Sequence, residues 1–194
     1  MTAIIDVIGA MIAGALIMIT IIYTIFNVQR NNFNMDMMFN MKTHAQHVVD
    51  VLDRAYLENV GAHMATAGPG MDIITAAGPD KFSYRSAKDP YVATVDLFEI
   101  RVVGSPNQYQ IEVTENGAVI FDSAPFFIAN NDIFTYIDFE GNQLDIAANP
   151  GAISSIGYCQ TNLIFTTFNH DTDVDSMLRY PITFWRGFKN LAIN

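Results

Sequence analysis

The chain has 194 residues, of which 51% are hydrophobic and 15% are charged, against a charged share of about 25% in ordinary soluble proteins. Ten Lys and Arg against 20 Asp and Glu give a net charge of −10, and residues 102–178 contain acids but no Lys or Arg. So acidic a surface repels phosphate backbones, and we expect no nucleic acid among the partners. At this length the chain forms one domain, or one domain with an appendage.

The N-terminus begins with a hydrophobic segment. Residues 7–26 carry no charge, and as an α-helix they would span about 30 Å, the thickness of a hydrocarbon core. No Lys or Arg precedes the segment, and its apolar part is longer than the roughly 7–15 residues typical of a secretory signal peptide. We therefore predict that residues 1–30 form a membrane anchor.

Asp6 is the only charged side chain among the first 26 residues. A lone charge costs about 2.5–3.5 kcal/mol at the centre of a bilayer and less near its edge. One explanation is that Asp6 pairs with a positive group, because removing one partner of a buried pair costs about 3–5 kcal/mol. The other is that Asp6 caps the helix start, where the macrodipole contributes about 0.3–1 kcal/mol. The uncharged segment that follows favours pairing.

A proline-free stretch extends beyond the anchor. The first proline is Pro69, which predicts a helix that continues as far as residue 67. Within residues 31–67, apolar residues recur every three or four positions, opposite a polar stripe; they are Met38, Met41, Ala45, Val48, Leu52 and Ala55. This pattern predicts an amphipathic continuation that packs on a globular body. Four asparagines within residues 27–34 predict a bend or a break between the two halves.

From residue 68 onward the hydrophobic period changes to two, which predicts a β-rich head over residues 68–194. The clearest hairpin is Gln108–Asp122, with its turn at Glu115-Asn116-Gly117. The expected fold is α+β, a long N-terminal helix packed on a mainly antiparallel sheet. The expected strands are Lys81–Ser86, Thr94–Val103, Gln108–Thr114, Ala118–Asp122, Phe134–Phe139, Thr161–Phe168 and Tyr180–Trp185.

An apolar helix with one acid near its start, an amphipathic continuation and a β-rich C-terminal domain resemble the type IV pilin superfamily, which includes the pseudopilins of type II secretion. Leu52-Asp53-Arg54-Ala55, Ala67-Gly68-Pro69-Gly70-Met71, Ile73-Ile74 and Phe82-Ser83-Tyr84 are similar in rhythm to the larger minor pilins and pseudopilins. The family has a short basic leader and Glu as the fifth mature residue. Here the acid is Asp at the sixth position, so either a leader has been removed and the acid is displaced, or loss of Met1 makes Asp6 the fifth residue.

The resemblance implies a structural subunit of an extracellular filament of identical subunits at the cell surface. Such a subunit is held in the inner membrane before the pilus assembly machinery polymerises it, and Asp6 faces the N-terminal amine of a neighbour. Small side chains let neighbouring helices approach closely, and aromatic and Met side chains extend the packing. The residues expected in helix–helix contacts are Gly9, Ala10, Ala13, Gly14, Ala15, Phe33, Met38 and Met41.

Two alternatives stay open. A minor pilin or pseudopilin would initiate or tip a filament or a secretion piston. A single-pass membrane protein would present a β-sheet binding module without polymerising. The sequence does not distinguish adhesion from motility, DNA uptake, secretion or conduction. It contains no nucleophile–base motif and no Gly-rich phosphate loop, so we expect no enzymatic activity.

A weak calcium candidate lies near the C-terminus. Asp171, Asp173 and Asp175 alternate as in the opening of a calcium loop, and some major pseudopilins bind calcium in this region. An EF-hand would need Gly and Glu where this chain has Ser176 and Ile182. A solvated acidic loop is the other interpretation, and we expect no other cofactor.

Two further features have more than one interpretation. Cys159 is the only cysteine, so it is either a buried thiol or part of an intermolecular bridge. The run Phe184-Trp185-Arg186-Gly187-Phe188 is either a ligand platform or an edge of the hydrophobic core.

Overall fold

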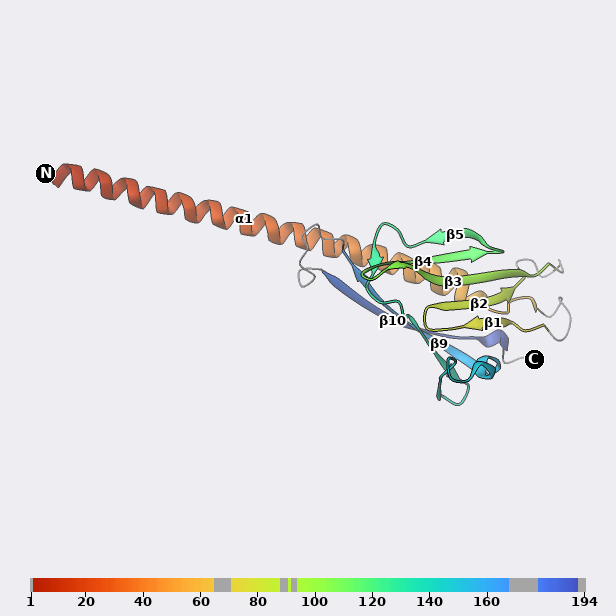
Figure 1. The fold of residues 1–194 in the computed structure, drawn as a ribbon. Coiled ribbons are helices and arrows are strands. Elements are labelled where there is room, and N and C mark those ends of the chain that lie inside the picture. Colours follow the sequence, from red (N-terminus) through yellow and green to blue (C-terminus); the bar gives the residue numbers. More distant parts are fainter. Residues whose placement is uncertain (1, 65–70, 88–90, 92–93, 168–177, 192–194) are drawn as a thin grey trace. The chain divides into compact units, whose positions relative to one another are not determined.

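The computed structural model describes residues 2–64, 71–87, 91, 94–167 and 178–191. The chain divides into two compact units, residues 1–40 and residues 41–194. The first unit is helical wherever it is described, and the second combines further helical turns with a sheet (Figure 1). The α+β prediction is therefore confirmed.

Helix α1 (Thr2–Asp50) extends through residues 27–34 without interruption, so the break expected at the four asparagines is absent. The intrinsic helix preference of Asn is less favourable than that of Ala by less than about 1 kcal/mol. Helix formation is cooperative, so the long helical segments on both sides stabilise the helical conformation of these asparagines.

The buried stripe of the amphipathic helix is confirmed as far as Leu52. Met41, Ala45, Val48 and Leu52 are at most 1% exposed, whereas Ala55, predicted to continue the stripe, is exposed. The reason is that α1 passes into the π-helix η1 (Val51–Tyr56), whose wider turns shift the helical phase. The next buried side chain is therefore Leu57, five residues after Leu52, in the 3₁₀-helix η2 (Leu57–Asn59).

The helical run ends at Asn59, earlier than the predicted residue 67. Gly61 has a φ of 68°, in the left-handed region that glycine adopts most easily. Its N–H donates to the carbonyl of Arg85, and the N–H of Ala87 donates to the carbonyl of Ala62. The end of the helical run is thus tied to the sheet, and Gly61 was the sequence signal for it.

The sheet has ten strands in the order β1-β2-β3-β4-β6-β9-β7-β8, with β5 paired to β4 and β10 paired to β9. Every pairing is antiparallel. The strands are β1 (Ile74–Ala77), β2 (Lys81–Ser86), β3 (Asp96–Ser105), β4 (Gln108–Glu115), β5 (Ala118–Asp122), β6 (Phe127–Ile128), β7 (Phe134–Asp138), β8 (Gln143–Leu144), β9 (Ile156–Thr166) and β10 (Arg179–Gly187).

Each predicted strand corresponds to an observed one, and β2 and β5 have the predicted bounds. The predicted β4–β5 hairpin is confirmed, and Asn116 and Gly117 at its turn have φ values of 51° and 86°. Both angles suit a two-residue hairpin turn. Strands β1, β6 and β8 were not predicted, because runs of two to four residues are too short to show a period of two.

The sheet curls so that β7 meets the turn between β1 and β2. The hydroxyl of Tyr136 donates to the carbonyls of Gly78 at 2.9 Å and Lys81 at 3.1 Å, and burial raises its pKa. Phe82, which is fully buried, lies at the centre of the aromatic core. Its ring centroid is 5.5–6.1 Å from those of Tyr84, Phe134, Tyr136 and Phe188.

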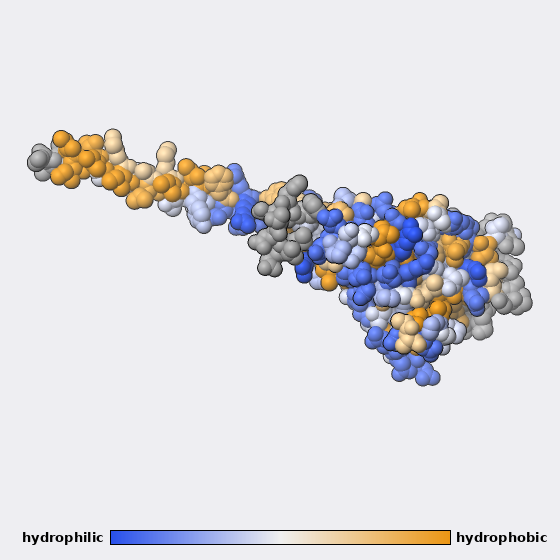
Figure 2. Space-filling view, viewed as in Figure 1, coloured by the Kyte–Doolittle hydropathy of each residue, from blue (hydrophilic) through white to orange (hydrophobic). Residues whose placement is uncertain are grey.

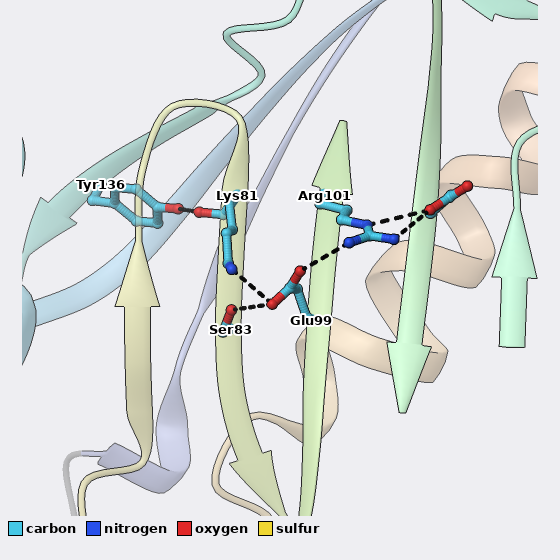
Figure 3. A network of polar contacts seen from close by, with 6 residues as sticks. Lys81, Ser83, Glu99, Arg101 and Tyr136 are labelled. Atoms are coloured by element: carbon cyan, nitrogen blue, oxygen red, sulfur yellow. Dashed lines mark hydrogen bonds and ion pairs between the residues drawn. The ribbon is translucent and has the colours of Figure 1, made fainter. Parts of the chain in front are cut away.

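A ladder of charged side chains crosses β2, β3 and β4 (Figure 3). The Lys81 ammonium lies 2.8 Å from the Glu99 carboxylate, and Arg101 lies 3.7 Å from Glu99 and 3.0 Å from Glu112. Lys81 and Arg101 are 44% and 43% exposed, so solvent screens these pairs. We attribute to the ladder mainly a preference for this strand register.

Arg186 joins strand β10 to the helical run through ion pairs with Asp53 and, at 3.7 Å, with Glu58 of η2. Arg186 donates from Nε and Nη2 to the two carboxylate oxygens of Asp53, which lies in η1. The two side chains are 22% and 27% exposed, and the hydrogen bond to Asp53 raises the pKa of Arg186. A bidentate, partly buried ion pair of this kind fixes the orientation of both side chains.

We expect Arg186→Gln to lower the free energy of unfolding by about 1–3 kcal/mol, because it removes both charge-assisted hydrogen bonds and leaves Asp53 without its partner. Chemical denaturation of the full chain, followed by circular dichroism, measures this change. Arg54→Gln is the matched control, since Arg54 pairs with Asp50 at 2.8 Å but the two side chains are 74% and 58% exposed. A loss below about 0.5 kcal/mol is expected there, and equal losses in both variants would contradict the assigned role of Arg186.

Candidate functional site

The first part of α1, residues 4–28, exposes hydrophobic side chains, and Figure 2 shows those on the face in view. Large apolar side chains from Ile4 to Val28 are 50–70% exposed. Phe33, Met35 and Phe39 continue this exposure at 64%, 70% and 69%. A helix that is hydrophobic all round requires an apolar environment, either lipid or other helices.

By length and composition, this helix is able to span a membrane. The helical stretch Ile4–Asn59 contains an 18-residue window of mean hydropathy 2.4, and none of that window is buried. Among the described residues it is the one stretch of this kind. The core helix of a soluble domain is also apolar, but such a helix is mostly covered by its own chain.

The two threonine hydroxyls within this apolar segment are hydrogen-bonded inside the helix. Thr20 donates to the carbonyl of Leu16 and Thr24 donates to the carbonyl of Thr20, each at 2.8 Å. A hydroxyl with a partner in its own helix enters a water-free environment at little cost. Both threonines are thus compatible with lipid or helix contacts.

The predicted small residues lie on the exposed part of α1. Gly9, Ala10, Ala13, Gly14 and Ala15 are all exposed. At Gly9 and Gly14 an added Cβ would meet no atom within 4 Å beyond the adjacent residues and the helix's own backbone. Gly9 with Ala13 and Ala10 with Gly14 are four residues apart, so each pair lies on one side of the helix. The helix backbone is therefore accessible to a neighbouring helix at both pairs.

Asp6 is exposed and, within the described part of the chain, forms no ion pair. Helix α1 begins at Thr2, and its first turn contains no acidic residue. The Asp6 carboxylate is available to a group from outside the chain.

The remaining residues predicted for helix–helix packing differ in their burial. Phe33 is 64% exposed and Met38 is half-buried, whereas Met41 is fully buried. Met41 belongs to the unit of residues 41–194 and is part of its core. Its side chain is thus unavailable to a neighbouring helix, because the stripe that covers the sheet begins there.

The calcium candidates Asp171, Asp173 and Asp175 lie outside the described residues. Within the described ranges, no group of three or more His, Cys, Asp or Glu side chains is placed to hold a metal ion. His44, which is on the helix, instead contacts the carbonyl of Ser123 through Nε2 at 2.9 Å and packs against the ring of Phe126.

Cys159 is fully buried in strand β9, which selects the buried-thiol interpretation over an intermolecular bridge. Desolvation by burial raises the pKa of the thiol to about 12, against a smaller opposing effect of the hydrogen bond with Thr161. The thiol therefore stays protonated at physiological pH, and its role is to fill the core.

No protein-family model matches this sequence, and no curated protein matches it. Among solved structures, a type IV-like pilin from Thermus thermophilus is similar with a TM-score of 0.46 and 9% sequence identity. The match covers 77% of this chain and 96% of that chain.

We expect Cys159 to resist alkylation by iodoacetamide in the folded chain at about pH 8, because the thiol is both inaccessible and protonated. After unfolding in guanidinium chloride the same thiol should react within minutes. Mass spectrometry of the intact chain before and after unfolding measures the difference. Complete labelling of the folded chain at the rate of the unfolded chain would contradict the assigned burial.

Proposed function

We propose that this protein is the structural subunit of an extracellular pilus-like filament that polymerises through the first part of α1. In the proposed mechanism, residues 7–26 are held in the inner membrane before assembly and lie against the equivalent helices of neighbouring subunits afterwards. The observation that carries the proposal is the exposure of 50–70% of each large apolar side chain from Ile4 to Val28.

The driving force is an exchange of one apolar environment for another. Burying a large aliphatic side chain is worth about 1.5–3 kcal/mol relative to water, but lipid already provides this gain. Close packing must therefore supply the preference for helices over lipid. The exposed small residues, with open space around Gly9 and Gly14, support this step because they allow backbones to approach.

The proposed register of the filament depends on Asp6. Placed among apolar helices, an unpaired carboxylate would be strongly destabilised, whereas one that faces the N-terminal amine of a neighbour is compensated. Only a limited set of axial positions brings the two charges together, so the pair selects one stagger between adjacent subunits. The exposure of the Asp6 carboxylate supports pairing with a group from another subunit.

The sheet-containing unit would face solvent in such a filament. Its excess of acidic residues would produce repulsion between neighbouring heads. Salt limits that repulsion to short range, because the Debye length is about 8 Å at physiological ionic strength. Assembly is therefore expected to improve as ionic strength rises from low to physiological values.

We expect Asp6→Ala to abolish filaments while the chain accumulates in the membrane with its sheet folded. The reason is that the neighbour's amine would be buried without a partner, at a cost of about 3–5 kcal/mol per contact. Electron microscopy of sheared filaments and immunoblots of the membrane fraction measure the two pools.

Asp36→Ala is the matched control, because Asp36 is also an exposed acid of α1 but lies beyond the uncharged segment. It should assemble normally, and Asp6→Glu should retain partial assembly because it keeps the charge. Normal filaments from Asp6→Ala would exclude the register mechanism. Absence of filaments from the unaltered chain, with all protein in the membrane, would favour a membrane-anchored binding module.

A further inference from the structure

One face of the sheet exposes aromatic rings beside neutral polar side chains. In the register of β9 with β10, Tyr158 lies opposite Gly187, Gln160 opposite Trp185, and Asn162 opposite Thr183. Residues directly opposite each other share a face of the sheet. The intervening residues Cys159, Thr161 and Leu163 are buried on the other face. We name the six paired residues the outer β9–β10 face; they are Tyr158, Gln160, Asn162, Thr183, Trp185 and Gly187.

Three aromatic side chains at one end of this face are half in solvent. Phe139 is 51% exposed, Tyr158 is 41% exposed and Trp185 is 57% exposed. They line a recess of about 370 Å³ together with Gly157, Gly187 and Lys189. This volume is within the roughly 300–1,000 Å³ range of small-molecule sites.

Two glycines fix the positions of two of the rings. A Cβ at Gly157 would lie 2.8 Å from Cδ1 of Phe139, and a Cβ at Gly187 would lie 3.0 Å from Cε1 of Tyr158. The rings of Phe139 and Tyr158 also contact each other edge to face, with centroids 6.3 Å apart. Both rings are therefore held in place before any ligand arrives.

Packing against a glycine, which accounts for the positions of Phe139 and Tyr158, does not account for the position of Trp185. Its partner in the register is Gln160, not a glycine, and it is the most exposed of the three rings. With Phe139 and Tyr158 it forms one exposed aromatic patch around the recess, and such a patch, unlike a single exposed side chain, is typical of a binding site. Trp185 therefore points to a ligand that covers it from the solvent side.

The polar part of the face is neutral. Asn162 accepts hydrogen bonds from Gln160 at 3.1 Å and from Thr183 at 2.8 Å. None of the six residues carries a charge, although the chain as a whole carries −10. Arg186, which also lines the recess, forms an ion pair with Asp53. Lys189 is the other cationic residue of the lining.

Aromatic rings beside neutral amides and hydroxyls match the chemistry of a pyranose sugar. One face of such a ring presents C–H groups that pack on aromatic surfaces, and its edge presents hydroxyls that exchange hydrogen bonds with amides. A nucleic acid would require a cationic groove along its backbone, and this face has none. We propose that the outer β9–β10 face, with Phe139, binds a neutral oligosaccharide.

The proposal does not depend on filament formation, because every residue in it belongs to the unit of residues 41–194. Trp185 is the only tryptophan of the chain, so intrinsic fluorescence reports on this face alone. The experiment uses the full chain in a detergent without a sugar headgroup. The probes are the trisaccharides of N-acetylglucosamine, galactose and mannose, each titrated separately.

We expect at least one trisaccharide to change the Trp185 fluorescence saturably, with a Kd of about 0.1–1 mM. Tyr158→Ala should weaken binding at least about tenfold, because it removes the central ring. Tyr91→Ala is the matched control, since Tyr91 is 92% exposed and lies outside this face. It should leave the Kd unchanged.

Circular dichroism shows whether Tyr158→Ala folds, and Gln160→Ala provides a second test that leaves every ring in place. No saturable change with any trisaccharide up to about 10 mM would overturn the proposal. A fluorescence change that follows protein concentration instead of sugar would also overturn it, and would assign the face to a second copy of this chain. An equal increase in Kd for Tyr91→Ala and Tyr158→Ala would show that the sugar binds non-specifically, and would overturn the proposal.

Discussion

The need to cover the apolar surface of α1 is the constraint on which the rest of the structure depends. One helix carries two hydrophobic surfaces that differ in how they are covered. From Met41 onward the stripe is buried by the sheet of the same chain, whereas from Ile4 to Val28 the side chains are 50–70% exposed. The chain thus satisfies one surface by folding and leaves the other to be covered from outside. The proposed function follows from that division, because lipid and neighbouring helices are the two coverings available.

The sheet provides the rigid part of this arrangement. The aromatic core around Phe82 and the hydrogen bonds from Tyr136 to the β1–β2 turn close the curled sheet on itself. The pair of Arg186 with Asp53 then fixes η1 to β10. The proposed assembly through α1 would consequently require no rearrangement of the core. The outer β9–β10 face lies on the side of β9 opposite the buried Cys159 and Leu163, so it is supported by the core without being part of it.

Much of the architecture could be predicted from the sequence, because its signals are local. The uncharged segment, the buried stripe through Leu52 and the Asn116-Gly117 hairpin each depend on residues close together in the chain. The failures have non-local causes. The phase shift after Leu52 arises from a π-helix whose Asp53 accepts hydrogen bonds from Arg186 of β10. The helix ends at Asn59, just before Gly61 donates to Arg85 and Ala62 accepts from Ala87. Of the three aromatic rings that line the recess at the outer β9–β10 face, the sequence indicated Trp185 alone. Phe139 and Tyr158 are brought to the same recess only by strand pairing.

The most direct test of the central claim is electron cryomicroscopy of filaments sheared from cells that produce this chain, with the intact mass of the subunit measured on the same sample. The account predicts helical filaments of this polypeptide, with α1 helices packed together in the core and the sheet-containing units on the outside. Recovery of the folded chain from membranes only, with no filament that contains it, would contradict the claim that other copies of α1 cover its apolar surface.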